Sequence, residues 1–93
     1  MFQIKRADIV YENGQQTALR VLFESGEEIL INFSDIPADR DTAAEKAAWL
    51  KEQLNERLIV GHKPDGTPIR HYKVNVVATS ENPFAVAWSW EAV

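Results

Sequence analysis

The basic residues between positions 62 and 73 are the strongest candidates for chemistry in this sequence. Lys63, Arg70, His71 and Lys73 lie within eleven positions. In a strand, alternate residues such as His71 and Lys73 project from one face. Clustered cations bind phosphate or carboxylate groups through charge-assisted hydrogen bonds. We therefore consider an anion-binding site here, with nucleic acid as one ligand class; the simpler alternative is a solvated surface.

A metal site is not expected in the same segment. His62 and His71 flank Asp65, so two imidazoles and one carboxylate lie close in sequence. Zinc sites need at least three converging ligands, and known sites show recognisable spacings such as H-E-x-x-H. No such spacing occurs in this chain. The sequence therefore predicts no metal ligands.

Signatures of catalysis are missing from the sequence. The chain has no cysteine, no glycine-rich phosphate loop and no G-x-S-x-G nucleophile motif. None of its serine or threonine residues has a histidine at a recognisable companion spacing. We therefore predict that the protein is not an enzyme and has no catalytic residues or cofactor.

The N-terminal third reads as three antiparallel strands. Asn13-Gly14 separates two β-rich runs, and this dipeptide favours a type I′ hairpin turn because both residues tolerate positive φ. After Phe23, a three-residue loop with Gly26 left-handed would set Val21 opposite Ile29. This register is preferred because it collects the apolar side chains on one face. That face contains Leu19, Val21, Phe23, Ile29, Ile31 and Phe33.

A helix is expected next. Thr42 and Glu45 have the spacing of a capping box, which satisfies free amides at a helix start. Apolar residues at helical spacing then continue to about Asn55 or Leu58. This stripe, predicted to face the sheet, comprises Ala43, Ala47, Leu50, Leu54 and Leu58.

The C-terminal third reads as further strands. Pro64-Asp65-Gly66 predicts a hairpin tip, with a second arm over residues 67–79 and a strand over 84–90. Residues 58–63 are read either as a strand or as a loop. The sequence therefore predicts one α+β domain, residues 1–93. Its mostly antiparallel sheet has five or six strands in the order βββ-α-ββ(β), with one helix packed on one face.

Arg6 and Asp8 have two interpretations. The Asn13-Gly14 register places both on the apolar face, where charges are costly unless paired, so they could form a small polar site. Alternatively, a β-bulge near residues 5–7 would send the charges outwards and turn Ala7, Ile9 and Tyr11 inwards. The bulge is the favoured interpretation because bulges are common in edge strands.

The second face of the predicted sheet is a candidate association surface, because one helix covers only one face. It could bind a protein partner or a second copy of the chain; scattered surface apolar residues are the alternative. Trp88 and Trp90 are interpreted as part of the hydrophobic core rather than as a surface on which bases or sugars stack. At every second position they share one face of the strand with Phe84 and Val86. The candidate interface residues are Ile9, Tyr11, Leu22, Leu30, Trp49, Val77, Ala85 and Ala87.

Charge is distributed unevenly along the 93 residues. The net charge of −4 argues mildly against nucleic acid as the main partner, but residues 24–45 hold seven acids and one base, whereas residues 57–73 hold four bases and one acid. The longest apolar run is five residues, so no membrane span is expected. We therefore predict a cytoplasmic protein that acts through protein–protein association, with anion or nucleic-acid binding as the alternative function.

Overall fold

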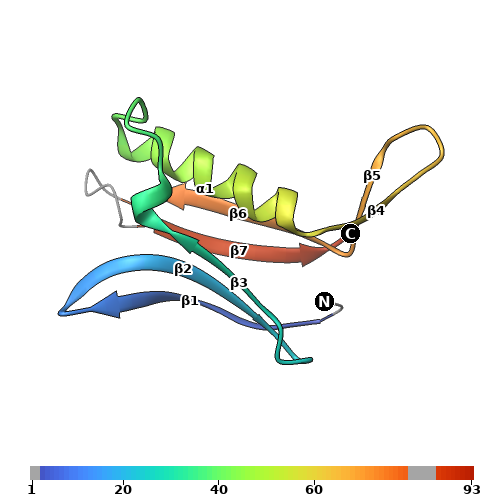
Figure 1. The fold of residues 1–93 in the computed structure, drawn as a ribbon, viewed down its shortest axis with the longest axis horizontal. Helices are drawn as coiled ribbons and strands as arrows, with labels where there is room; N and C mark the ends of the chain where they lie inside the picture. Colours follow the sequence, from blue (N-terminus) through green and yellow to red (C-terminus); the bar gives the residue numbers. More distant parts are fainter. Residues whose placement is uncertain (1–2, 80–85) are drawn as a thin grey trace.

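The computed structural model describes residues 3–79 and 86–93. The described residues form one helix, one short 3₁₀ turn and seven strands, so the predicted α+β class with mostly antiparallel pairing is confirmed (Figure 1). The elements are β1 (Ile4–Glu12), β2 (Gln15–Phe23), β3 (Glu28–Asn32), η1 (Phe33–Asp35), α1 (Ala43–Arg57), β4 (Ile59–His62), β5 (Pro68–Arg70), β6 (Tyr72–Ala78) and β7 (Val86–Ala92).

The first three strands form one antiparallel sheet in the order β1-β2-β3. Asn13 and Gly14 both have positive φ, 52° and 79°, as a type I′ turn requires. Between β2 and β3, Val21 lies opposite Ile29, so the predicted register is confirmed. All six apolar residues of the predicted inner face are buried.

Two irregularities in the pairing of β1 with β2 determine on which face of the sheet the charged side chains of β1 lie. The register shifts between Ile4 and Arg6 and again between Val10 and Tyr11. Asp8 therefore lies opposite Arg20, whereas Ala7 and Ile9 pack against the core. The bulge interpretation is confirmed for these residues. Tyr11 lies beyond the second shift and is 60% exposed, so its expected inward position is wrong.

The remaining strands do not extend this sheet. Residues 59–62 form β4, which pairs with β5, and β6 pairs separately with β7. The predicted single sheet of five or six strands is therefore replaced by three separate ladders. The arm expected over residues 67–79 is interrupted at His71, where β5 ends and the chain bends into β6. The β4–β5 hairpin projects from the body (Figure 1).

The helix begins and ends as its sequence predicts. Oγ1 of Thr42 accepts a hydrogen bond from the Glu45 amide at 3.1 Å, and the Glu45 carboxylate accepts one from the Thr42 amide at 3.3 Å. The predicted stripe is buried along its whole length. No helix in residues 3–79 and 86–93 is long and apolar enough to cross a membrane.

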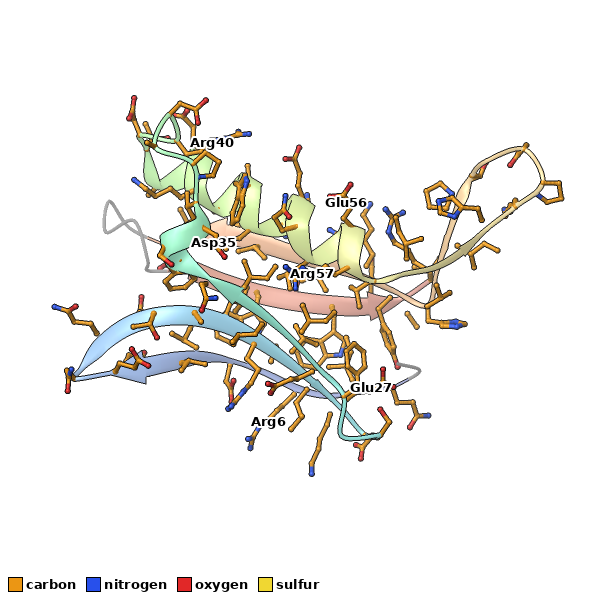
Figure 2. All side chains as sticks on the ribbon, viewed as in Figure 1. Arg6, Glu27, Asp35, Arg40, Glu56 and Arg57 are labelled. Carbon is orange, nitrogen blue, oxygen red and sulfur yellow. The ribbon has the colours of Figure 1, made fainter. Side chains whose placement is uncertain are left out.

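The core lies between two layers. One layer is the sheet β1-β2-β3, and the other consists of α1 beside the β6–β7 hairpin (Figures 1 and 2). Val74 and Val76 of β6 join Leu50 and Leu54 of α1 in the same buried cluster as the sheet residues. Side chains fill the space between the layers, and Arg57 reaches from the end of α1 to the carbonyl of Leu30 in β3.

Candidate functional site

The helix lies alongside β6 and bonds its outer edge at Val74. The Asn55 side chain accepts a hydrogen bond from the Val74 amide and donates one to the Val74 carbonyl, both at 2.9 Å. It also donates to the Lys51 carbonyl at 3.0 Å. An amide side chain thus replaces a neighbouring strand at this point, because it offers the donor and the acceptor that a strand would offer.

Arg70 ties the end of β5 to the same helix turn. Its Nε donates to the main-chain carbonyl of Asn55 at 2.8 Å. A cation that binds a carbonyl near a helix C-terminus also interacts favourably with the helix dipole. The guanidinium is thereby held beside α1.

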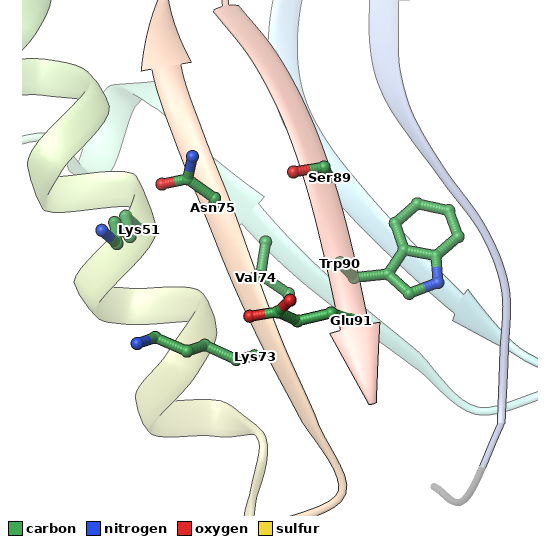
Figure 3. Close-up of a pocket in the computed structure, with 7 residues that line it drawn as sticks. All are labelled: Lys51, Lys73, Val74, Asn75, Ser89, Trp90 and Glu91. Carbon is green, nitrogen blue, oxygen red and sulfur yellow. The ribbon is translucent and has the colours of Figure 1, made fainter. Parts of the chain in front are cut away.

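Three adjoining cavities follow this junction and share their lining residues. A cavity of about 350 Å³ is lined by Lys51 and Lys73, a second of about 680 Å³ by Lys51, Asn55 and Arg70, and a third of about 380 Å³ by Asn55, Arg70 and Lys73. Figure 3 shows the first cavity between α1 and the outer face of β6–β7. We call the surface formed by Lys51, Arg70 and Lys73 around Asn55 the basic cleft.

Acidic residues line the basic cleft together with its cations. Glu52 and Glu56 lie along the second cavity and Glu91 along the first. Within the described part of the chain, none of these carboxylates forms an ion pair with Lys51 or Lys73. Glu91 lies opposite Lys73 in the ladder, but the Lys73 side chain extends towards α1 (Figure 3).

The predicted anion-binding set is partly assembled. Arg70 and Lys73 line the basic cleft together, whereas Lys63 lies in the connection of the projecting β4–β5 hairpin. His71 is exposed in the bend between β5 and β6, and its carbonyl accepts a hydrogen bond from the Val93 amide at 3.0 Å. Lys51, the third cation of the basic cleft, does not belong to the predicted anion-binding set.

The signals for Lys51 and Asn55 in the sequence are weak. Lys51 looks like an ordinary helix-surface lysine, about one turn before Asn55 and therefore on the same helix face. Asn55 disfavours a helix interior, and that preference is a hint that its side chain has another role. Neither feature reveals that β6 lies beside this face.

The histidines do not converge. In the β4–β5 ladder His62 lies opposite Pro68, and Pro68 is three positions before His71 in the chain. The Asp65 carboxylate accepts a hydrogen bond from the Thr67 amide at 2.9 Å, and this bond lowers the pKa of Asp65. No group of three potential metal-ligating side chains occurs within residues 3–79 and 86–93.

The candidate interface residues do not form one surface. Ile9 and Trp49 pack against the core as partly buried residues. Tyr11 is exposed, Leu30 is 39% exposed and Leu22 is half-buried on the β1-β2-β3 sheet. Val77 and Ala87 are opposite each other in the other layer and are exposed. Ala85, like Phe84, lies outside the described residues.

The outer edge of β7 is a second candidate site. The β6–β7 ladder is regular from end to end, and no described strand pairs with the other side of β7. Trp88 packs against the core, as predicted, but Trp90 is 38% exposed. In Figure 3 the Trp90 ring points away from the two lysines. β7 therefore combines free backbone groups with accessible aromatic surface.

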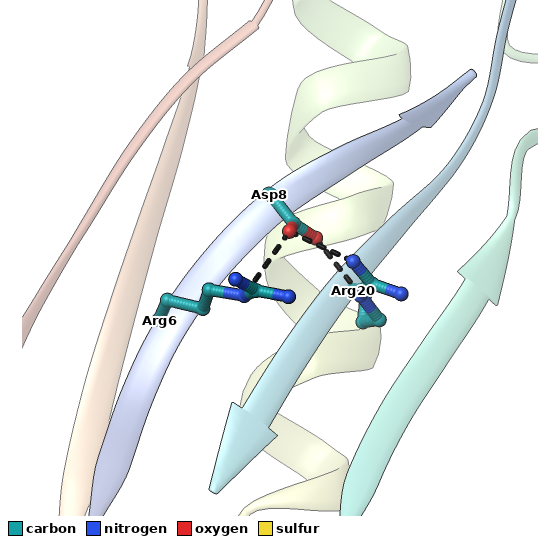
Figure 4. Close-up of polar contacts among 3 residues, drawn as sticks. All are labelled: Arg6, Asp8 and Arg20. Carbon is teal, nitrogen blue, oxygen red and sulfur yellow. Dashed lines mark hydrogen bonds and ion pairs between the residues drawn. The ribbon is translucent and has the colours of Figure 1, made fainter.

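The edge of β1 is different because charged residues lie along it. Asp8 accepts two hydrogen bonds from the Arg20 guanidinium at 2.9 and 3.0 Å, and Arg6 lies 3.4 Å from the same carboxylate (Figure 4). The hydrogen bonds from Arg20 lower the pKa of Asp8. The neighbouring irregularity at residues 4–6 also disturbs the edge, and both features oppose strand addition.

Comparison with models of protein families, with curated protein sequences and with solved structures finds no match to this chain.

Proposed function

We propose that this protein is a non-enzymatic binding domain that acts by pairing with a second copy of itself along the outer edge of β7. The observation that carries this proposal is the seven-residue β7, which has a regular ladder on one side and no described partner strand on the other. An open strand edge presents a row of unpaired amides and carbonyls that another strand can satisfy.

The composition of β7 favours strand addition. Its sequence VAWSWEA contains one charged residue, Glu91. By contrast, β1 contains four charged residues and two register shifts. Natural edge strands avoid pairing by means of charges and bulges, and β7 has little of either protection.

A second copy is the partner that best suits the pattern of β7. In an antiparallel pair centred on Ser89, Trp88 of each copy lies opposite Trp90 of the other. Cross-strand aromatic pairs stabilise sheets, and the symmetry creates this pair twice. The exposed side of Trp90 would be covered as the ladder extends to four strands, β6-β7-β7-β6.

The test is the mass of the protein in solution, measured by sedimentation equilibrium from about 1 to 100 μM, a range in which a specific dimer dissociates measurably. We expect the mass to rise with concentration to twice the 10.6 kDa of one chain. The variant Ser89→Lys brings two lysines together at the symmetry axis, so it should remain monomeric. A constant 10.6 kDa for the wild type overturns the proposal.

The matched control is Tyr11→Lys, which adds the same charge at an exposed position of β1. It should associate like the wild type. If Tyr11→Lys separates the copies and Ser89→Lys does not, the contact lies on the β1-β2-β3 sheet and the β7 proposal is wrong. Circular dichroism of both variants establishes that the fold is retained.

A further inference from the structure

We propose that the basic cleft binds a phosphate group, in a site formed by Lys51, Arg70 and Lys73. The three cations of this site lie on α1, on β6 and at the end of β5, whereas the association proposed for β7 uses the free edge of that strand. β7 contributes Ser89, Trp90 and Glu91 to one wall of the first cavity (Figure 3). Three cations from three different elements line these cavities two at a time, although 22 positions separate Lys51 from Lys73 in the chain.

Arg70 is oriented for a ligand by its own anchoring. Its Nε is bonded to the Asn55 carbonyl, which fixes the plane of the guanidinium. Its two terminal nitrogens have no acceptor among the described residues, so they are available to an incoming anion. A planar guanidinium with two free terminal NH₂ groups suits two oxygens of one phosphate.

The two lysines complete the charge of the site. Lys51 is half-buried, Lys73 is exposed, and neither has an ion-pair partner in residues 3–79 and 86–93. Asn55 fixes the distance between their elements because its side chain joins α1 to β6 at Val74. The scaffold around the cations is therefore already ordered in the free protein, which lowers the cost of binding.

The charge pattern selects a small, highly charged anion. Three cations suit a phosphate dianion better than a single carboxylate. Glu52, Glu56 and Glu91 line the same cavities, so any anion meets like charges there, and a long polyanion would meet more of them than a single phosphate does. The expected ligand is inorganic phosphate or a small phosphate monoester.

The experiment is a titration of the ¹⁵N-labelled protein with inorganic phosphate, followed by two-dimensional NMR, with sodium chloride at equal ionic strength as the reference. We expect saturable shifts of the amides around Asn55 and Val74. The double variant Lys51→Gln/Lys73→Gln should bind phosphate at least about tenfold more weakly, since charge-assisted hydrogen bonds are lost. Lys63→Gln, on the projecting hairpin, is the control and should bind like the wild type.

The outcomes separate the ligand sources. If phenyl phosphate binds more tightly than inorganic phosphate, the ligand is a phosphate monoester; equal affinities indicate the free ion. Three results overturn the proposal: shifts that chloride reproduces, an equal loss in Lys63→Gln, and no saturable shift. The proposal is also wrong if a single-stranded oligonucleotide binds much more tightly than phosphate and Lys63→Gln weakens that binding. The polyanion would then bind along the β4–β5 hairpin rather than in the basic cleft.

Discussion

The two edges of the β6–β7 hairpin differ in whether their backbone groups have hydrogen-bond partners. The β6 edge is closed at Val74, where Asn55 bonds both backbone groups, whereas the β7 edge meets no described strand. Both strands belong to one regular ladder, so the contrast does not arise from strand geometry. It arises because a helix residue with both a donor and an acceptor lies beside β6, whereas no residue in 3–79 or 86–93 bonds the outer edge of β7 in this way.

This contrast separates a stabilising contact from a binding surface. A strand edge that is satisfied within the chain contributes to folding, because buried backbone groups are costly without partners. An open edge with apolar side chains contributes little to the monomer but is available for association. We therefore expect substitutions at the closed edge to change the free energy of unfolding, and substitutions at the open edge to change the association of two copies in solution.

The largest effect is expected for Asn55→Ala. This change removes both bonds to Val74 and leaves its amide and carbonyl without partners beside α1. We expect the free energy of unfolding to fall by about 2–3 kcal/mol, as for other part-buried groups that lose partners. Urea unfolding followed by circular dichroism measures it.

The control for Asn55 is the exposed Glu52→Ala, which should change the free energy of unfolding by less than about 0.5 kcal/mol. Equal effects of the two substitutions would show that Asn55 does not close the β6 edge. Asn55→Asp adds a further comparison, because a carboxylate can accept from the Val74 amide but, when ionised, cannot donate to its carbonyl.

A smaller effect is expected for Arg70→Met, which keeps the aliphatic stem but removes the 2.8 Å hydrogen bond to Asn55. We expect a loss of about 1–1.5 kcal/mol in the free energy of unfolding. Arg57→Met is the matched comparison, because the hydrogen bond from Arg57 to Leu30 is longer, 3.4 Å, and exposed. If Arg57→Met is the more damaging change, Arg70 is not part of the closed edge.

The smallest effect is expected at the edge of β1. The bonds from Arg20 lower the pKa of Asp8 in the folded protein, so their stabilising contribution is present above the unfolded pKa, near 4, and is lost as the pH falls through the lower folded pKa. Because one third of each side chain is exposed, we expect less than about 1 kcal/mol. Unfolding of wild type and Asp8→Asn between pH 2 and pH 6 tests this, and the difference should shrink with acidification.

Local patterns predicted the first half of the fold well. The Asn13-Gly14 turn, the register of Val21 with Ile29 and the capping box at Thr42 are all as expected. Each depends on residues near in sequence or on one buried face, so periodicity and turn chemistry are sufficient to identify it. The position of Tyr11 was wrong because a second register shift cannot be read from alternation.

The candidate sites were less predictable. The spacing of basic residues in the chain predicts Arg70 and Lys73, and both line the basic cleft, but Lys51 comes from the helix. The single sheet was expected because alternating strands fit either one sheet or several. The chain instead forms three ladders, and α1 takes the place beside β6 that another strand would occupy.

The amino-acid sequence by itself determined the turns, the helix with its cap, the buried stripe and the inner face of the first sheet, because these follow from neighbouring residues and from the periods of helix and strand. Only the tertiary structure decided which strand edge is closed and which cations lie together. Those outcomes depend on where α1 packs, and that depends on contacts between residues such as Asn55 and Val74, 19 positions apart.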